Sequence, residues 1–87
     1  MVMNIGKLVL ERRKAKEIFG IKEDINLNDL KSIYRTLARK NHPDGNRNNP
    51  EEATRNMAKI NHAYEILLNP ESEEEKHIRR FYENFII

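Results

Sequence analysis

Two segments of the chain carry apolar residues at the spacing of an α-helix that buries one face. The first row of apolar residues comprises Leu27, Leu30, Ile33, Tyr34, Leu37 and Ala38, and the second comprises Ala53, Met57, Ile60, Tyr64 and Leu67. Steps of four and three residues alternate in the second row, which suits the seam between two antiparallel helices. The two rows therefore predict a helical hairpin as the body of the fold.

Glycine, asparagine and proline residues divide the chain into four predicted helices with no convincing strand. The first helix spans about residues 7–19 and ends where Gly20 can adopt the left-handed conformation of a C-cap. Its buried side is predicted to contain Leu8, Ala15, Ile18 and Phe19. The second helix begins at Asn26 and ends near Asn41, because Pro43 disfavours helical geometry in the residue before it.

The third predicted helix has Asn49 as its N-cap and Pro50 at its first helical position, and it ends at Asn69. Ser72 can cap a fourth helix, because Glu75 lies three positions further on, as in a capping box. The apolar residues of this helix are Ile78, Phe81, Tyr82 and Phe85. The four helices together give an all-α fold. Residues 42–49, which connect the second and third helices, form a loop at the upper end of the usual length, and long loops often carry function.

The chain has 87 residues, enough for one domain spanning residues 1–87 and too few for two hydrophobic cores. It contains no cysteine, which excludes disulfides, thiolate nucleophiles and cysteine-ligated metal sites. The longest apolar stretch near the N-terminus is residues 8–10, far shorter than the ~20 residues of a membrane span. We therefore expect a cytoplasmic protein with no membrane contact.

Positive charge is concentrated on the second predicted helix. The net charge of the chain is only +2, but residues 30–43 include no acidic side chain. The basic residues in that stretch are Lys31, Arg35, Arg39 and Lys40. At about 100° per residue, Lys31, Arg35 and Arg39 lie roughly 90–170° from the centre of the apolar row, so they face solvent. A basic face of this kind predicts an acidic protein surface as the partner.

The connection after this basic helix begins with His42-Pro43-Asp44, and the flanking sequence resembles a known family. Residues 35–44 are RTLARKNHPD and residues 59–67 are KINHAYEIL. Together with Tyr34, eight positions before His42, these segments resemble the J-domain of DnaJ-type co-chaperones. The resemblance covers roughly residues 14–70, and the combination of motifs is far more specific than the tripeptide alone.

The resemblance implies a small four-helix J-domain, with a central antiparallel hairpin and the His-Pro-Asp loop at its tip. Such a domain is a co-chaperone module that docks on the ATPase domain of a DnaK-type heat-shock chaperone and stimulates ATP hydrolysis. By the family's pattern, His42, Pro43 and Asp44 form the triggering loop. The docking face consists of Lys31, Arg35, Arg39 and Lys40. The module is not itself an enzyme, and we expect a monomer that takes no cofactor and meets client proteins through regions not present here.

Three features depart from the family's pattern. Residues 15–21 are AKEIFGI where the first helix of a J-domain often has Tyr-Tyr-Glu-Ile-Leu-Gly-Val, and Gly45 replaces the lysine common after His-Pro-Asp. Residues before and after Ser72 are acidic where the family is usually more basic, namely Glu71, Glu73, Glu74 and Glu75. We therefore assign the fourth helix a packing role only, and do not carry over to it any partner contacts of the family.

Other kinds of site are disfavoured by the placement of the residues. His42, His62 and His77 fall on a loop and two different helices without a His-x-x-x-His pair, so we assign no metal. An acid–base pair of His42 and Asp44 would need a nucleophile and a concave pocket, for which the sequence offers no evidence.

A small basic helical domain that binds nucleic acid is the alternative function, since a basic helix joined to a second helix can mimic a helix-turn-helix. That motif needs a turn of roughly three or four residues, whereas about eight separate these two helices. Its recognition helix is also the second of the pair, whereas the basic side chains here lie on the first. We therefore expect no nucleic-acid partner.

Overall fold

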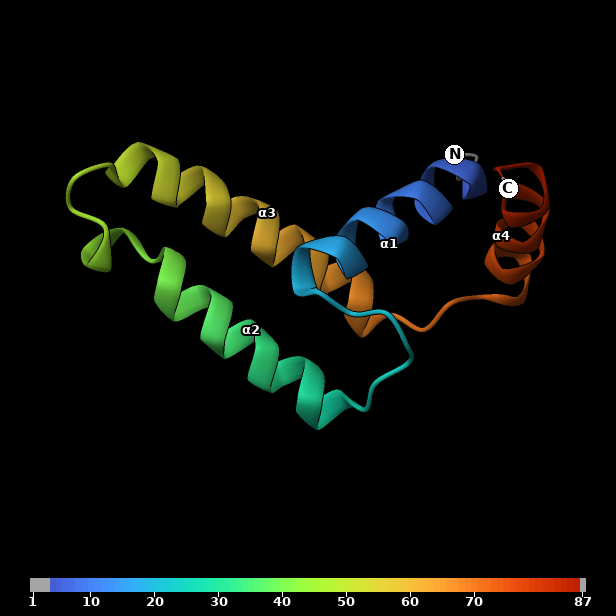
Figure 1. Cartoon of the computed structure of the whole chain (residues 1–87), viewed down its shortest axis with the longest axis horizontal. Helices are drawn as coiled ribbons and strands as arrows, with labels where there is room; N and C mark the ends of the chain where they lie inside the picture. The colour runs from blue at the N-terminus through green and yellow to red at the C-terminus, as the bar shows by residue number, and fades with distance from the viewer. Residues whose placement is uncertain (1–3, 87) are drawn as a thin grey trace.

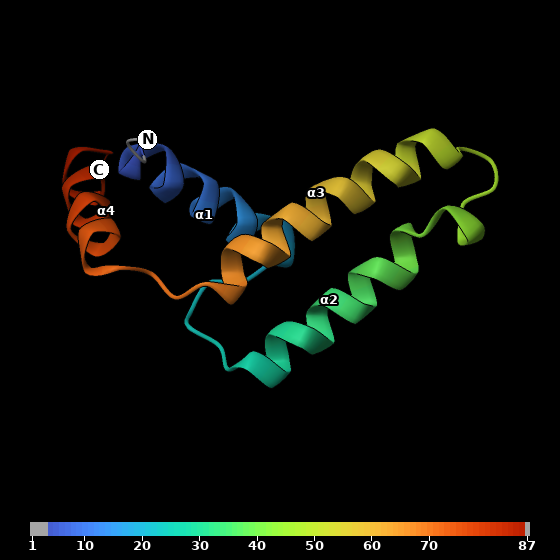
Figure 2. The same ribbon diagram turned by 180° about the vertical axis from the view of Figure 1, so that it is seen from behind.

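The computed structural model describes residues 4–86, with side chains described for residues 4–84. Its elements are α1 (Ile5–Phe19), α2 (Leu27–Asn41), the single 3₁₀ turn η1 (Pro43–Gly45), α3 (Pro50–Leu68) and α4 (Glu73–Ile86). The all-α fold class is confirmed, because the described part of the chain contains helices and no strand. Helices α2 and α3 form an antiparallel hairpin with η1 at its tip, while α1 and α4 lie at the other end of the molecule (Figures 1 and 2).

Most helix ends lie where the capping residues predict them. The Asn26 side chain accepts a hydrogen bond from the backbone N–H of Asp29 at 2.8 Å. Gly20 ends α1 with φ +67°, in the left-handed region, and the Ile21 N–H donates to the Lys16 carbonyl. The start of α1 differs: the helix begins at Ile5 rather than near residue 7, because Asn4 accepts the backbone N–H of Lys7 and caps it.

The core lies where α1, α2 and α3 meet. Its buried residues are Ala15, Phe19, Leu30, Ile60, Ala63 and Ile66. Helix α3 supplies half of them, and it packs more extensively on α1 than on α2. The prediction that the α2–α3 hairpin is the body of the fold is therefore incomplete, since α3 is a central helix with two neighbours.

The predicted buried face of α1 is partly wrong. Ile18 is 41% exposed and Leu8 is only half-buried, whereas Val9 and Arg12 are buried. The reason is that α1 contacts both α3 and α4, which turns its buried face toward Val9 and Arg12. In α2, Leu27 is 52% exposed, because it lies at the first turn of the helix, outside the core.

Aromatic stacking joins the three core helices. The rings of Tyr34 and Tyr64 stack with centroids 4.2 Å apart, and Phe19 stacks on Tyr64 at 6.2 Å. The Tyr34 hydroxyl donates to the Asn61 side chain at 2.7 Å. Both tyrosines pack against the core cluster, as their places in the apolar rows predict.

Helix α4 packs on α1 through a buried ion pair. The Arg12 guanidinium binds both carboxylate oxygens of Glu75, with Nε 2.7 Å from Oε2, and Glu75 is only 3% exposed. Ser72 accepts the backbone N–H of Glu75 and caps the helix, as predicted. Phe81 is 54% exposed, and the side chain of Phe85 lies outside the described residues. None of the described helices is long and apolar enough to cross a membrane.

Candidate partner-binding site

The tip loop, residues 42–49, begins where α2 ends at Asn41. His42 leaves the helix in an extended conformation, with φ −67° and ψ 137°, as expected for a residue that precedes proline. Pro43–Gly45 then form the single turn η1, in which the Gly45 N–H donates to the His42 carbonyl at 3.1 Å. The loop ends at Asn49, whose side chain caps α3 by accepting the backbone N–H of Glu52.

The turn brings the side chains of His42 and Asp44 together at the surface. The Nδ1 atom of His42 accepts the backbone N–H of Asp44 at 3.2 Å and lies 3.6 Å from Asp44 Oδ2. The two side chains are 56% and 92% exposed, so the imidazole and especially the carboxylate are accessible to a partner.

Asparagine side chains brace the loop, and sequence reasoning missed this role. The Asn46 side-chain amide donates to the carbonyls of Lys40 at 3.0 Å and His42 at 2.8 Å. The Asn41 amide donates to the Leu37 carbonyl, and the Asn56 amide of α3 donates to Asn41 Oδ1. The available signal was the run of asparagines around Gly45, since asparagine readily bonds nearby backbone groups in turns.

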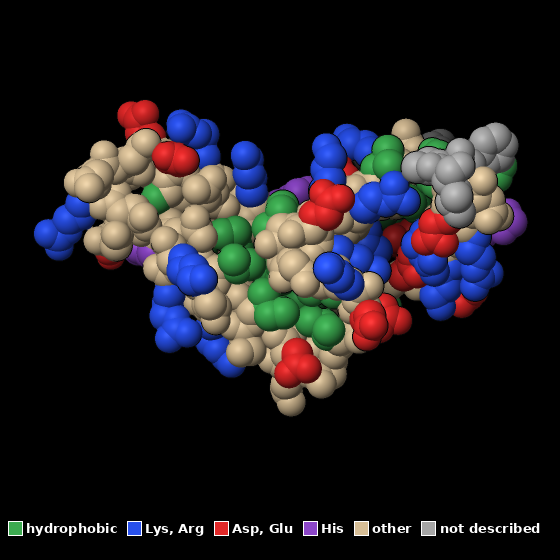
Figure 3. Space-filling model, viewed as in Figure 1, with side chains coloured by type: hydrophobic (Ala, Val, Ile, Leu, Met, Phe, Trp, Pro, Cys, Tyr) green, Lys and Arg blue, Asp and Glu red, His purple; other side chains and the backbone are tan. Residues whose placement is uncertain are grey.

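All four basic residues of the predicted docking face are exposed on α2, and none makes an ion pair within the described residues. Lys31, Arg35 and Arg39 follow one another at four-residue spacing, so they form a row along one side of the helix. Lys40 projects roughly 100° around the helix from Arg39. In Figure 3, Lys and Arg side chains gather along the lower left edge, where α2 runs toward the tip loop.

The structure brings the predicted residues together unevenly. Arg39 and Lys40 lie in the last turn of α2, directly before His42. Lys31 lies in the first half of the helix, and at ~1.5 Å per residue it is roughly 17 Å along the axis from His42. The candidate site is therefore an elongated surface that runs from the tip loop along α2.

A cleft of about 610 Å³ lies between the tip loop and the start of α3, although the sequence offered no evidence of a concave pocket. Its lining is rich in amides and includes Asp44, Arg47 and Glu52, but not His42. No hydroxyl or thiol side chain lines it among the described residues. The cleft therefore does not place a nucleophile beside a His42–Asp44 pair.

The three histidines lie apart in the fold, on the tip loop, α3 and α4. Over residues 4–84, no group of three or more metal-ligating side chains gathers. The connection between α2 and α3 contains η1 and the residues around it, and the basic row lies on the first helix of the pair. This arrangement differs from a helix-turn-helix, in which the turn is short and the second helix is the recognition helix.

Comparison with known proteins decides the family. The family model described as the DnaJ domain matches residues 16–84. This chain belongs to the DnaJ domain family. The match runs from the second half of α1 into α4, so it begins near the start of the residues 14–70 that carry the motifs and continues beyond their end. The tip loop and the docking face both lie within the matched DnaJ domain.

Curated relatives agree with this membership. The chain is 40% identical over 68 residues to DnaJ homolog subfamily C member 21 of Danio rerio, covering 78% of this chain and 11% of that protein. It is 42% identical over 60 residues to Chaperone protein DnaJ of Carboxydothermus hydrogenoformans, covering 69% and 16%. It is 40% identical over 73 residues to Chaperone protein dnaJ 15 of Arabidopsis thaliana, covering 84% and 16%.

The DnaJ domain described here thus spans between about a tenth and a sixth of the length of these relatives. Two of the three are named as chaperone proteins, and none of the three names is that of an enzyme. No solved structure matches the chain significantly.

Proposed function

We propose that this DnaJ domain is a monomeric co-chaperone module that docks on the ATPase domain of a DnaK-type heat-shock chaperone and stimulates its ATP hydrolysis. In this proposal His42, Pro43 and Asp44 are the trigger. The docking face, Lys31, Arg35, Arg39 and Lys40, supplies the attraction to an acidic surface of the chaperone. Membership of the DnaJ domain family supports a partnership with a chaperone of this type in general.

The observation that carries the proposal is the exposed His42–Asp44 pair at the end of a basic helix. Asp44 is 92% exposed, so its carboxylate can accept two parallel hydrogen bonds from an arginine of the chaperone. Pro43 fixes one backbone angle of the turn and thereby reduces the conformational entropy lost on docking. The loop is also braced before any partner arrives, because Asn46 bonds the carbonyls on either side of Asn41.

Charge explains the second part of the proposal. The basic side chains of α2 have no acidic partner within the described residues, so their charge is available to another molecule. Attraction between a basic face and an acidic surface chiefly raises the association rate. The helix would therefore steer the encounter, while the tip loop would make the contacts that stimulate hydrolysis.

Single-turnover ATP hydrolysis by a DnaK-type chaperone tests the trigger. We expect His42→Gln and Asp44→Ala each to abolish the stimulation, because each removes a polar group from the exposed pair. Both side chains are exposed, so the free energy of unfolding should change by no more than about 0.5 kcal/mol.

Asp24→Ala is the matched control, because it removes an exposed carboxylate from the linker between α1 and α2. It should stimulate as well as the unaltered chain. If folded His42→Gln and Asp44→Ala variants stimulated hydrolysis normally, the assignment of the trigger to the tip loop would be wrong.

A further inference from the structure

One peptide bond of the tip loop has an unusual chemical liability. The chain has three aspartates, Asp24, Asp29 and Asp44, and only Asp44 is followed by glycine. The backbone nitrogen after an aspartate can attack the side-chain carboxyl, and a side chain on the following residue hinders that ring closure. Glycine has no side chain, so it removes this hindrance. No asparagine of the chain precedes a glycine, which leaves Asp44–Gly45 as the only site of this kind.

The structure leaves this bond accessible. The Asp44 side chain is 92% exposed, so no packing holds its carboxyl in place. Gly45 is exposed, and a Cβ added to it would have only the Arg39 carbonyl within 4 Å, at 3.9 Å, so the space beside its α-carbon is open. Gly45 also does not have a positive φ, which means that the turn does not require glycine there.

We infer that Asp44–Gly45 is a site of spontaneous isomerisation, at which Asp44 converts to isoaspartate through a succinimide. The Gly45 nitrogen attacks Cγ of the protonated Asp44 carboxyl, and a C–N bond forms. The Cγ–OH bond breaks, and the hydroxyl leaves as water with the amide proton. Water then adds to the α-carbonyl carbon of the ring and opens it, so that the main chain runs through Cβ and Cγ. Addition at Cγ instead restores aspartate, and neither route needs a co-reactant other than water.

The hydrogen bonds of the loop set the rate of this reaction. The Gly45 nitrogen donates to the His42 carbonyl in the closed turn, so this bond must break before the nitrogen can attack. A single 3₁₀ turn at the surface can open locally while the helices stay folded, because the hydrogen bonds that hold it lie within residues 40–46. The Asn46 amide, which bonds the same His42 carbonyl and that of Lys40, opposes opening. Loss of Asn46 should therefore accelerate the modification.

The consequence rests on the proposed function. Isoaspartate lengthens the main chain by one atom and converts the Asp44 side chain into a shorter α-carboxylate. The carboxylate would then no longer lie beside His42 in the geometry that a partner arginine needs. An aged population of this DnaJ domain would thus contain a growing fraction of folded molecules without an intact trigger.

The experiment ages the folded chain for weeks at neutral pH and physiological temperature in heavy-oxygen water. Peptide mapping with electron-transfer fragmentation measures isoaspartate and heavy oxygen at each aspartate. We expect both to accumulate at Asp44, and neither at Asp24 or Asp29, which precede isoleucine and leucine. Heavy oxygen entering Asp24 as fast as Asp44, or absent from Asp44 altogether, would overturn the inference.

Two variants test separately the Asp-Gly sequence and the hydrogen bonds that close the turn. Gly45→Ala should slow the modification several-fold, and the chain can accommodate it because the added Cβ meets no close neighbour. Asn46→Ala leaves the Asp44–Gly45 sequence intact and should raise the rate several-fold. An unchanged rate in Asn46→Ala would show that the closed turn does not gate the reaction, and an unchanged rate in Gly45→Ala would overturn the site itself.

ATP hydrolysis measured on the same aged samples separates the two proposals. Stimulation should fall in proportion to the isoaspartate content at Asp44, and Gly45→Ala should lose it more slowly. If isoaspartate accumulated while stimulation stayed constant, the modification site would stand and the trigger assignment of Asp44 would fail. If the chain did not isomerise but Asp44→Ala abolished stimulation, the trigger would stand and the modification site would fail.

Discussion

One guanidinium group holds together the end of the molecule opposite the tip loop. Besides its ion pair with Glu75, Arg12 donates to the carbonyls of Ile66 at 3.1 Å and Asn69 at 2.8 Å. These carbonyls lie at the C-terminal end of α3, where backbone acceptors lack partners within the helix. Arg12 therefore provides hydrogen-bond donors for the carbonyls at the end of α3 and positions α4 at the same time.

Breaking the ion pair should destabilise the fold strongly. Glu75→Gln leaves the buried Arg12 charge without its carboxylate, which typically costs about 3 kcal/mol or more. Glu74→Gln is the matched control, because it removes an exposed carboxylate from the same turn of α4 and should change stability by no more than about 0.5 kcal/mol. Urea unfolding followed by circular dichroism measures both, and equal stabilities would contradict the role of the buried pair.

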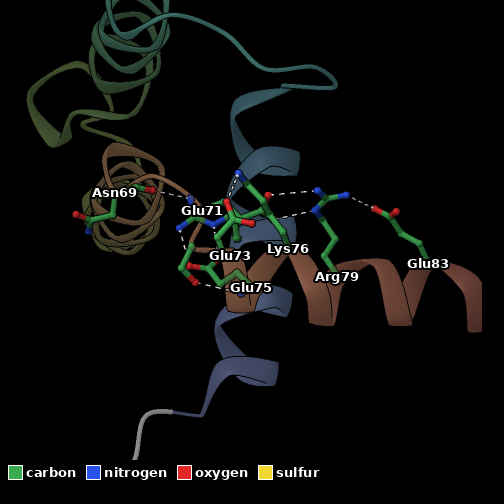
Figure 4. Close-up of polar contacts among 9 residues, drawn as sticks. Asn69, Glu71, Glu73, Glu75, Lys76, Arg79 and Glu83 are labelled. Carbon is green, nitrogen blue, oxygen red and sulfur yellow. Dashed lines mark hydrogen bonds and ion pairs between the residues drawn. The ribbon is translucent and has the colours of Figure 1, made fainter.

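A second arginine makes part of the stability dependent on pH. Burial acts to raise the pKa of Glu71, but the hydrogen bond and charge of Arg79, with Lys16 and Arg12 nearby, hold that pKa below its ordinary value of 4.5. Figure 4 shows Arg79 between Glu71 and Glu83, and its Nε lies 2.8 Å from Glu71 Oε2. The carboxylates in turn raise the pKa of Arg79.

The sign of the pH dependence follows from the lowered pKa. A carboxylate with a lower pKa in the folded state contributes stability that is complete above 4.5 and is lost as the pH falls through the folded-state value. Glu71→Gln should therefore weaken the loss of stability on acidification. Unfolding free energies measured from neutral to acid pH check this, with the exposed Glu65→Gln as control. Parallel pH profiles for Glu71→Gln and the unaltered chain would contradict it.

For the helices, the sequence predicts where each one begins and ends better than it predicts which face is buried. Asn26, Gly20 and Asn49 act on backbone groups a few residues away, so their caps form whatever the tertiary packing. The buried face of a helix depends instead on all its neighbours. Ala63 and Ile66 are buried in the core although they lie outside the apolar row of α3, and Ile18 is exposed although it is apolar. The ion pair between Arg12 and Glu75 joins residues 63 positions apart, which no local pattern indicates.

The hairpin seam can be tested by truncating side chains along it. Ile60 is 4% exposed in the core, so Ile60→Ala should cost about 2 to 5 kcal/mol, and half-buried Leu37→Ala should fall near the lower end of that range. Leu27→Ala, in the same apolar row but 52% exposed, should cost much less. Thermal unfolding followed by circular dichroism ranks the three variants. Unaltered midpoints in both Ile60→Ala and Leu37→Ala would rule out the packed seam.

The candidate site and the contact between α1 and α4 lie in different parts of the molecule. It measures 44 × 30 × 27 Å, and the tip loop and α4 lie at opposite ends of the longest dimension (Figure 1). The residues of the candidate site all lie within residues 31–44, so the motif and the charge pattern were sufficient to predict where they lie. The hydrogen bonds that the Asn46 side-chain amide makes to fix the loop could not be predicted in the same way. They form only because the Asn46 side chain folds back onto residues that precede the turn.

The electrostatic part of the proposal belongs to the molecule as a whole, because it depends on which surface carries the charge. Arg35→Glu together with Arg39→Glu alters two exposed side chains of α2 and keeps good helix formers, so the domain should stay folded. Association with the chaperone should then slow sharply at low salt. The association of the unaltered chain should itself weaken as salt rises, because the screening length shortens.

Arg55→Glu together with Lys59→Glu is the matched control, since these two exposed residues of α3 have the same spacing and the pair of reversals changes the net charge equally. If net charge alone mattered, both double variants would slow association alike, whereas a docking face on α2 requires the larger effect from Arg35 and Arg39.

The same proteins should be offered mixed-sequence duplex DNA at physiological salt. Tight, salt-sensitive DNA binding without any effect on a DnaK-type ATPase would favour the nucleic-acid alternative. Full chaperone stimulation by the α2 variant would confine the function to the tip loop.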